Sequence, residues 1–371
     1  MRAPVWRVDG AGPIMTAIRH WTFPPVPFKD IDMVSYNKSE AREWALENLT
    51  GCSGVTLPSY SNDLKHLNER GIRHDIARQM QLGFTYTLLC SEVAISAQEN
   101  QQLTHWARDT AGGKFGLFFH AAWGTLADNI EALRLAEEAG ADLVLLSYPP
   151  QFWPTTEQEI YDYTRAICDA TRLGVMIFPI PTWGFERVHP AGMSLGLIRR
   201  LLDDVPNIVA IKSEQGFPLI AGVVEMWHHF GEKVVISCPI EGDAIPLMRL
   251  LPLQFSGTSN SQWMSDYYPK TFALSRQGRF EEAMEQYWKV QPARIAGSAV
   301  QAASAPGAGV LNRTAWKYQD WLAGFNGGPL RAPATRIPDR FMAQLRKSLK
   351  DSGLPVTPDA DKDFIVGRFP V

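Results

Sequence analysis

Cysteine is scarce in this sequence, and the few cysteines present form no recognisable pattern. The chain has 371 residues, and Cys52, Cys90, Cys168 and Cys238 include no Cys-x-x-Cys pair. Proteins that rely on disulfide frameworks are usually short, secreted and rich in cysteine. We therefore expect reduced thiols in a cytoplasmic protein.

An excess of charge of one sign is also lacking. The formal net charge is -3, charged residues make up 20% of the chain, and no dense basic tract occurs. This argues against nucleic acid as a partner. No apolar run approaches the roughly 18 residues of a membrane span, and the first residues lack a continuous apolar signal segment. We expect neither a nucleic-acid nor a membrane partner.

Paired histidines at metal-binding spacing are missing as well. The sequence contains no His-x-His or His-x-x-x-His pair. His228 and His229 are adjacent, so their side chains diverge on a helix. Although His120, Glu214 and Glu241 could each be a ligand, no motif joins them. We therefore expect no metal and no cofactor.

What the sequence does contain is a regular alternation of apolar strands and helices. Eight short runs, most of them apolar without alternation, are typical of parallel strands that are covered on both faces. Stretches with helical spacing, such as 129–139 and 157–171, separate them. The expected strands are 54–58, 84–90, 115–120, 142–147, 173–178, 207–212, 233–238 and 253–257.

Eight strand–helix units predict an α/β fold, a (β/α)₈ TIM barrel with an N-terminal extension and C-terminal helices. A doubly wound sheet is the alternative, but no Gly-x-Gly-x-x-Gly follows the first strand. We expect residues 1–50 to form the extension, with one helix capped by Ser39 and stopped by Gly51. Residues 51–290 would form the barrel, and 291–371 a C-terminal helical region and tail.

The most informative residue is Lys212, which ends the apolar run 207–212. A lysine at the end of a buried strand is costly unless it is paired or used. Desolvation lowers the pKa of a lysine, and the neutral amine can attack a carbonyl to form a Schiff base. The plainer alternative is a surface lysine that extends its amine into water.

Several segments resemble, in order and spacing, the dihydrodipicolinate synthase/N-acetylneuraminate lyase family of class I aldolase-type barrels. They span roughly residues 51–353 and comprise Ile208–Lys212, Gly140–Pro150, Phe255–Asn260, Gly278–Ala283 and the stretch from Trp316 to Pro333. The resemblance implies that Lys212 forms a Schiff base with pyruvate or a related keto acid. It also implies a homo-oligomer, either a dimer or a tetramer.

The sequence departs from the family pattern after the second strand. The family's Gly-Thr-Thr-Gly-Glu loop, which holds the carboxylate of the keto acid, is replaced by Thr87-Leu-Leu-Cys-Ser-Glu92. Cys90 and Ser91 fall where substrate contacts are expected. The paired threonines are missing, so the use of pyruvate is left open.

Further departures follow the fourth and fifth strands. Trp153, with Phe152 beside it, aligns best with the family's catalytic tyrosine, and an indole cannot relay a proton as a phenol can. The fifth strand ends in Phe178-Pro-Ile-Pro181 instead of Tyr-Asn-x-Pro. An arginine that usually follows the tyrosine is also missing. The chain thus resembles a divergent member that does not make dihydrodipicolinate.

Other residues near the strand ends allow two interpretations each. Tyr60 and His120 are candidate proton relays, although His120 could equally be a buried core histidine. Asn260 could bind a carbonyl compound or shape a turn. We prefer Glu214 as a helix cap over a partner of Lys212.

Aromatic residues gather at or after the predicted strand ends, and part of this set is expected to form an apolar pocket wall. The set comprises Tyr60, Tyr86, Trp123, Tyr148, Phe152, Trp153, Phe178 and Trp183.

Together these residues predict an enzyme, a Schiff-base-forming lyase of aldolase or hydratase-aldolase type. Its small-molecule substrate would be a keto acid or related carbonyl compound, with a bulky or aromatic partner. A keto-sugar-acid dehydratase that uses the same lysine is the first alternative. A non-catalytic barrel that binds a metabolite is the second.

Overall fold

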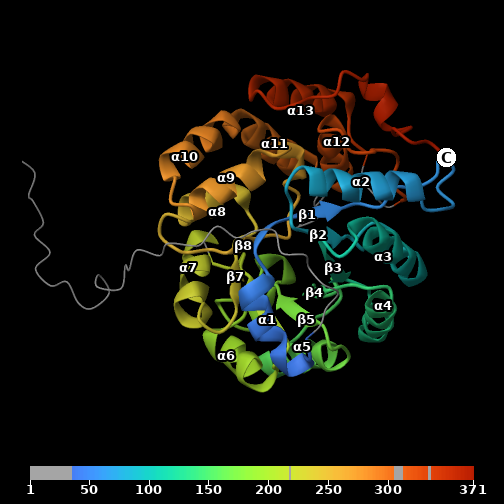
Figure 1. The fold of residues 1–371 in the computed structure, drawn as a ribbon. Coiled ribbons are helices and arrows are strands. Elements are labelled where there is room, and N and C mark those ends of the chain that lie inside the picture. The colour runs from blue at the N-terminus through green and yellow to red at the C-terminus, as the bar shows by residue number, and fades with distance from the viewer. Residues whose placement is uncertain (1–35, 217–218, 305–311, 333–335) are drawn as a thin grey trace, which may run out of the picture.

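The predicted barrel is confirmed. The computed structural model describes residues 36–216, 219–304, 312–332 and 336–371. Eight parallel strands close on themselves in sequence order, with β8 paired to β1 (Figure 1). The strands are β1 (Gly51–Thr56), β2 (Tyr86–Leu89), β3 (Gly116–Ala121), β4 (Leu143–Leu146), β5 (Gly174–Ile177), β6 (Ile208–Lys212), β7 (Val235–Ser237) and β8 (Phe255–Ser256).

Helices surround the strands and cover the outer face of the barrel (Figure 1). Several begin at a polar cap that accepts a backbone N–H, as Ser96 does from Glu99 and Thr156 from Glu159. The surrounding helices are α2 (Glu69–Gln81), α3 (Ala97–Ala111), α4 (Leu126–Glu138), α5 (Glu157–Asp169), α6 (Leu195–Asp204), α7 (Leu219–Phe230) and α8 (Glu241–Leu247).

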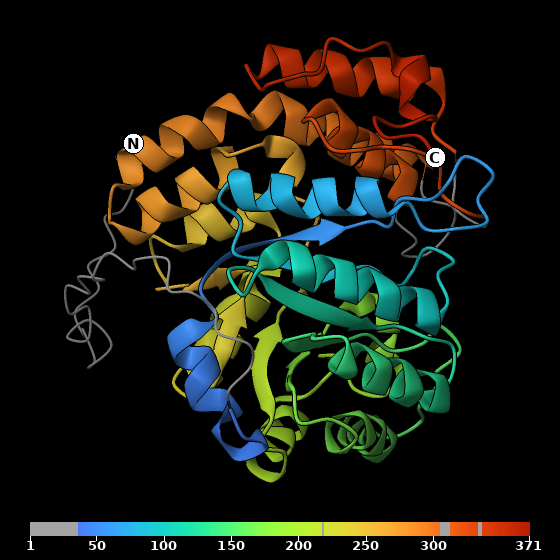
Figure 2. The ribbon, with the colours of Figure 1, turned by 45° about the vertical axis from the view of Figure 1, so that its right-hand side comes forward.

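A second group of helices follows β8 and gathers on one side of the barrel, beside α2 (Figures 1 and 2). His74 of α2 bonds the Gly324 carbonyl, and Asp75 accepts the Asn326 N–H at 2.6 Å. This group comprises α9 (Tyr267–Arg276), α10 (Phe280–Lys289), α11 (Gln291–Ser304), α12 (Arg313–Leu322) and α13 (Asp339–Asp351). Among the described residues, every helix is too short or too polar to cross a lipid bilayer. The boundaries 1–50, 51–290 and 291–371 stay predictions.

The helix predicted before the barrel is present as α1 (Ala41–Asn48), and it covers the amino end of the strands. Arg42 donates to the Ile208 carbonyl at 2.8 Å, and Gln254 donates to the Leu49 carbonyl at 3.0 Å. Because α1 closes this end, the opposite end is the one left for a site. The part of the extension over residues 1–35 lies outside the described residues.

The predicted ends of α1 are wrong by a few residues. A 3₁₀ turn, Lys38–Glu40, precedes α1, and the Glu40 carboxylate accepts the backbone N–H of Asn37 at 3.0 Å. Ser39 therefore lies inside this turn and does not cap the helix. Gly51 does not stop α1 either: it begins β1 with a φ of +89°, a conformation that favours glycine.

The core fills both sides of the strands, as the unalternated apolar runs predict. Inside the barrel, the rings of Tyr86, Phe118 and Phe255 pack with centroids 5.6–6.0 Å apart. A side chain at Gly116 would collide with the Tyr86 ring, since a Cβ there would lie 2.0 Å from it. Tyr86, which we assigned to the aromatic wall, thus belongs to the barrel interior, and its hydroxyl donates to the Asn48 carbonyl at 2.9 Å.

Candidate active site

Lys212 lies at the carboxyl end of β6, where it pairs with Ser237 of β7. Its side chain is buried, and Nζ lies 3.2 Å from Glu214 Oε1 and 3.6 Å from the centroid of the Phe178 ring. Burial lowers the pKa of the amine, and the carboxylate of Glu214 acts in the opposite direction. The interpretation of Lys212 as a solvent-exposed surface lysine is therefore wrong.

Our preference for Glu214 as a helix cap is also wrong. The next helix, α7, begins at Leu219, five residues further along the chain, and the Glu214 carboxylate pairs with the Lys212 amine. The sequence signal, an acid just before a predicted helix, does not reveal that α7 begins only at Leu219. Glu214 is thus the partner of the buried lysine.

His120 of β3 belongs to the same end of the barrel. Its Nε2 is 2.9 Å from the Ser147 hydroxyl and 3.9 Å from Glu92 Oε1, and Nδ1 has no partner among the described residues. Burial, partly offset by Glu92, lowers the pKa of His120 to about 4. The imidazole is therefore neutral near pH 7. The Ser91 hydroxyl donates to the backbone carbonyl of His120 at 2.8 Å and so helps to fix this residue.

Glu92 and Arg313 are site residues that the sequence interpretation missed. Nη2 of Arg313 binds Glu92, and the guanidinium stacks on the Trp316 ring at 4.2 Å. Burial opposes ionisation of Glu92, but Arg313 and His120 outweigh it and lower the pKa to about 2. Glu92 ends the altered carboxylate loop, and this position could have identified it as a site residue. Nothing local singles out Arg313, which belongs to α12.

Cys90 lies beside this group, as expected for the end of β2. Cys90, Glu92 and His120 bring three potential metal-ligand atoms within 4.8 Å of one another. Burial raises the pKa of the thiol to about 11, however, and Arg313 already holds the Glu92 carboxylate. A metal needs a thiolate and a free carboxylate, so this set fits a metal poorly.

Tyr60 contacts Arg331 and the loop after β2. Its ring lies 4.2 Å from the guanidinium carbon of Arg331, and its hydroxyl donates to the Val93 carbonyl at 3.2 Å. Burial raises the pKa of the phenol. A proton-relay role for Tyr60 stays a prediction, since its hydroxyl is already engaged.

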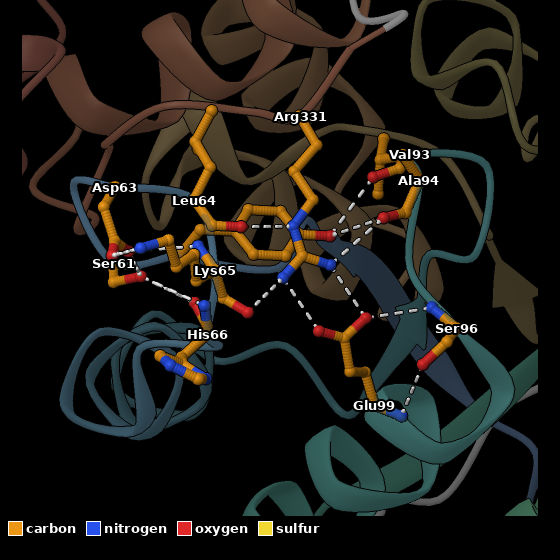
Figure 3. Close-up of polar contacts among 11 residues, drawn as sticks. Ser61, Asp63, Leu64, Lys65, His66, Val93, Ala94, Ser96, Glu99 and Arg331 are labelled. Carbon is orange, nitrogen blue, oxygen red and sulfur yellow. Dashed lines mark hydrogen bonds and ion pairs between the residues drawn. The ribbon is translucent and has the colours of Figure 1, made fainter.

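Arg331 ties two loops of the barrel mouth together (Figure 3). It donates to the carbonyls of Leu64 at 2.7 Å and Lys65 at 3.0 Å, and it pairs with Glu99 at 2.8 Å. Leu64 and Lys65 belong to the loop after β1. Glu99 lies in the first turn of α3, which follows the loop that carries Glu92. Arg331 thereby holds that loop in place.

The two aromatic residues predicted after β4 pack against partners other than Lys212. Phe152 packs against Tyr148 and Tyr163, with ring centroids 5.6 Å and 4.8 Å away, on the side of α5. Trp153 is 72% exposed, and its ring lies under Arg187 at 3.7 Å. Their assignment as substrate contacts is left untested.

Of the predicted aromatic wall, Phe178 and Trp183 lie at the lysine. The two rings meet edge to face at 5.6 Å, and the Trp183 N–H donates to the Phe178 carbonyl at 2.6 Å. Trp123 instead stacks on Phe119, and Tyr148 bonds Thr164 of α5. A pocket wall formed by part of the aromatic set stays a prediction.

Asn260 lies in a different polar cluster. With its amide oriented to suit its neighbours, its nitrogen donates to Asp320 at 3.1 Å, and Gln262 donates to the same carboxyl group at 2.9 Å. Lys317 lies nearby and donates to the Pro58 carbonyl at 2.7 Å. This buried network joins α12 to the barrel, and substrate binding by Asn260 stays a prediction.

Comparisons with known proteins agree with the geometry. The model of the dihydrodipicolinate synthetase family matches residues 77–296, which is more than half of the chain. A 4-hydroxy-tetrahydrodipicolinate synthase of Clostridium perfringens is 25% identical over 229 residues, 61% of this chain and 71% of that enzyme. An uncharacterized DapA-like lyase of Pyrobaculum arsenaticum is 19% identical over 319 residues, 82% of this chain and 99% of its own.

Solved structures share the fold. Dihydrodipicolinate synthase from Aquifex aeolicus superposes with a TM-score of 0.70 at 18% identity, covering 83% of this chain and 99% of its own. N-acetylneuraminate lyase from Fusobacterium nucleatum superposes with a TM-score of 0.65 at 17% identity, covering 81% of this chain and 98% of its own. The chain therefore belongs to the dihydrodipicolinate synthetase family, as a divergent member and an enzyme of the class I aldolase type.

Proposed function

We propose that the protein is a Schiff-base-forming lyase in which Lys212 reacts with a keto acid or related carbonyl compound whose partner is bulky or aromatic. The observation that carries this proposal is the buried amine at the carboxyl end of β6, between the Glu214 carboxylate and the Phe178 ring. Active sites of such barrels lie at this end of the strands. Cytoplasmic location and homo-oligomeric assembly stay predictions.

The environment of Lys212 suits the attack on a carbonyl. Burial favours the neutral amine, and the neutral amine is the nucleophile. It adds to the carbonyl carbon, and loss of water gives an iminium ion. The electron pair of the neighbouring C–C bond then moves into the iminium to form an enamine, while the hydroxyl of the departing partner loses its proton and becomes a carbonyl. Protonation of the enamine and hydrolysis restore the lysine.

Proton transfer in this reaction needs a base, and the family's tyrosine is missing. Glu214 is in contact with the amine, and neutral His120 is hydrogen-bonded to Ser147. Both groups lie at the carboxyl end of the strands, as Lys212 does. We assign the relay to them ahead of Tyr60, whose hydroxyl donates to the Val93 carbonyl.

The partner is proposed to be apolar because aromatic rings line the approach to the amine. Phe178 lies against Lys212, Trp183 packs on Phe178, and Trp316 lies under Arg313. An aromatic wall offers few partners for the hydroxyl groups of a sugar acid. It therefore supports the dehydratase alternative less well.

Trapping with borohydride tests the proposal. The protein is incubated with pyruvate, phenylpyruvate or benzaldehyde, reduced, and weighed by intact-protein mass spectrometry. Wild type and the control Lys233→Met, which changes an exposed lysine, should gain the mass of one reduced adduct. Lys212→Met should gain none. The absence of an adduct with all three compounds in wild type would sink the proposal.

A further inference from the structure

The mouth of the barrel holds two ion pairs. One joins Lys212 to Glu214, and the other joins Arg313 to Glu92. The positive charge of Arg313 also disfavours protonation of both Lys212 and His120, so it lies within the electrostatic field of the reacting amine. An arginine of α12 thus belongs to the site, although it lies about a hundred residues after the lysine in the sequence.

The side chains of β2 and of the loop after it are poor receptors for the carboxylate of a keto acid. Thr87 and Thr56 bond each other at 2.8 Å. Gln79 of α2 also bonds the Thr56 hydroxyl, which places both groups on the helix side of the strands. Ser91 gives its hydroxyl to the His120 carbonyl. The remaining polar side chain of this loop at the site is Glu92, which would repel a substrate carboxylate.

Arg313 supplies the donors that this loop lacks. A guanidinium group carries five N–H donors in a planar fork that matches a carboxylate. Nη2 binds Glu92, while no described residue accepts a hydrogen bond from Nε or Nη1. The ring of Trp316, 4.2 Å away, holds the guanidinium plane in place. A carboxylate, that of Glu92, already occupies the position that an anionic substrate would need.

We propose that Arg313 is the receptor for the substrate carboxylate and that Glu92 occupies it until the keto acid arrives. This inference rests on the proposed Schiff-base chemistry of the same site. The incoming carboxylate replaces Glu92 on the guanidinium. The displaced Glu92 carboxylate then turns to His120, from whose Nε2 its Oε1 is already only 3.9 Å away. In the free site, the Glu92 carboxylate balances the positive charge of Arg313.

The test compares keto acids with their uncharged esters. Borohydride trapping rates are measured for pyruvate, phenylpyruvate and the methyl ester of each. Arg313→Gln should lower the rate with the keto acids by roughly 10- to 100-fold, the value of a charge-assisted hydrogen bond, and the rate with the esters by less than about 3-fold. Arg187→Gln is the matched control, because Arg187 also stacks on a tryptophan but is exposed.

The variant Glu92→Gln separates a receptor from a purely structural ion pair. If Glu92 competes for Arg313, this variant should trap keto acids at least as fast as wild type. Equal losses with acids and esters in both Glu92→Gln and Arg313→Gln would overturn the inference, because the pair would then only hold the mouth in shape. Thermal unfolding of each variant shows whether the protein is folded.

The outcomes also distinguish the inference from the function on which it rests. If wild type traps esters or benzaldehyde but neither keto acid, the Schiff-base function stands and Arg313 is not a carboxylate receptor. Trapping of keto acids at an unchanged rate in Arg313→Gln leads to the same conclusion. If wild type traps none of the compounds, the Schiff-base function fails, and the inference falls with it.

Discussion

Replacing His120 should remove a defined part of the pH dependence of stability. His120 is 3% exposed, and burial, partly offset by Glu92, lowers the pKa of its imidazole to about 4 from the usual 6.5. The unfolded chain therefore binds this proton more tightly than the folded protein does. Stability is fully present above pH 6.5 and is lost as the pH falls toward 4.

The size of the effect follows from the two pKa values. A shift of one pKa unit corresponds to 1.36 kcal/mol, so the whole shift is worth about 3 kcal/mol. Between pH 7 and pH 5, the contribution of this one histidine to the free energy of unfolding should fall by about 2 kcal/mol. The variant His120→Gln, whose amide can still reach Ser147, lacks this contribution.

Urea unfolding at pH 7 and pH 5 measures the difference. The free energy of unfolding of wild type should fall by about 2 kcal/mol more than that of His120→Gln over this interval. The control His105→Gln, on the exposed face of α3, should fall as much as wild type. Equal pH dependence in wild type and His120→Gln would refute the account of a buried neutral imidazole.

Three further changes test other parts of the site. Glu214→Gln should lower the pKa of the reacting lysine further, so the acid limb of the trapping rate should move to lower pH; a shift to higher pH would contradict the ion pair. Phe178→Ala should slow trapping by about 10-fold, whereas Trp153→Ala should change it by less than about 2-fold, because only the first ring contacts the amine. A larger loss of trapping rate in Trp153→Ala than in Phe178→Ala would place the aromatic wall on the loop after β4. Arg331→Gln should lower the free energy of unfolding in urea by about 2 to 4 kcal/mol, against less than about 0.5 kcal/mol for the exposed Arg134→Gln, and equal losses would show that Arg331 does not hold the loops.

The barrel could be predicted from the sequence because its strands are covered on both faces. Buried parallel strands leave unalternated apolar runs, and a regular series of eight such runs separated by helices leaves few other folds. The strand ends were less predictable, since they depend on pairing with neighbours. The run 253–257, for example, contributes only Phe255–Ser256 to β8, which meets β7 at a single residue pair.

The central lysine could be predicted, but most of its neighbours could not. Lys212 ends a strand, and the carboxyl ends of all eight strands meet at one place, so its position follows from the topology. The contact between Glu92 and Arg313 joins residues 221 positions apart, and no local pattern encodes it. Glu214 was misassigned because its partner depends on how a loop turns. Phe152 and Trp153 follow a strand end, but their partners, Tyr163 of α5 and Arg187, are set by packing that the sequence does not reveal.

The central claim is that the amine of Lys212 carries the chemistry. Peptide mapping by mass spectrometry, after borohydride reduction in the presence of phenylpyruvate, tests this most directly. The account predicts one reduced adduct, on the peptide that contains Lys212, with every other lysine unmodified. An adduct on another lysine, or no adduct where wild type turns over a carbonyl substrate, would contradict it.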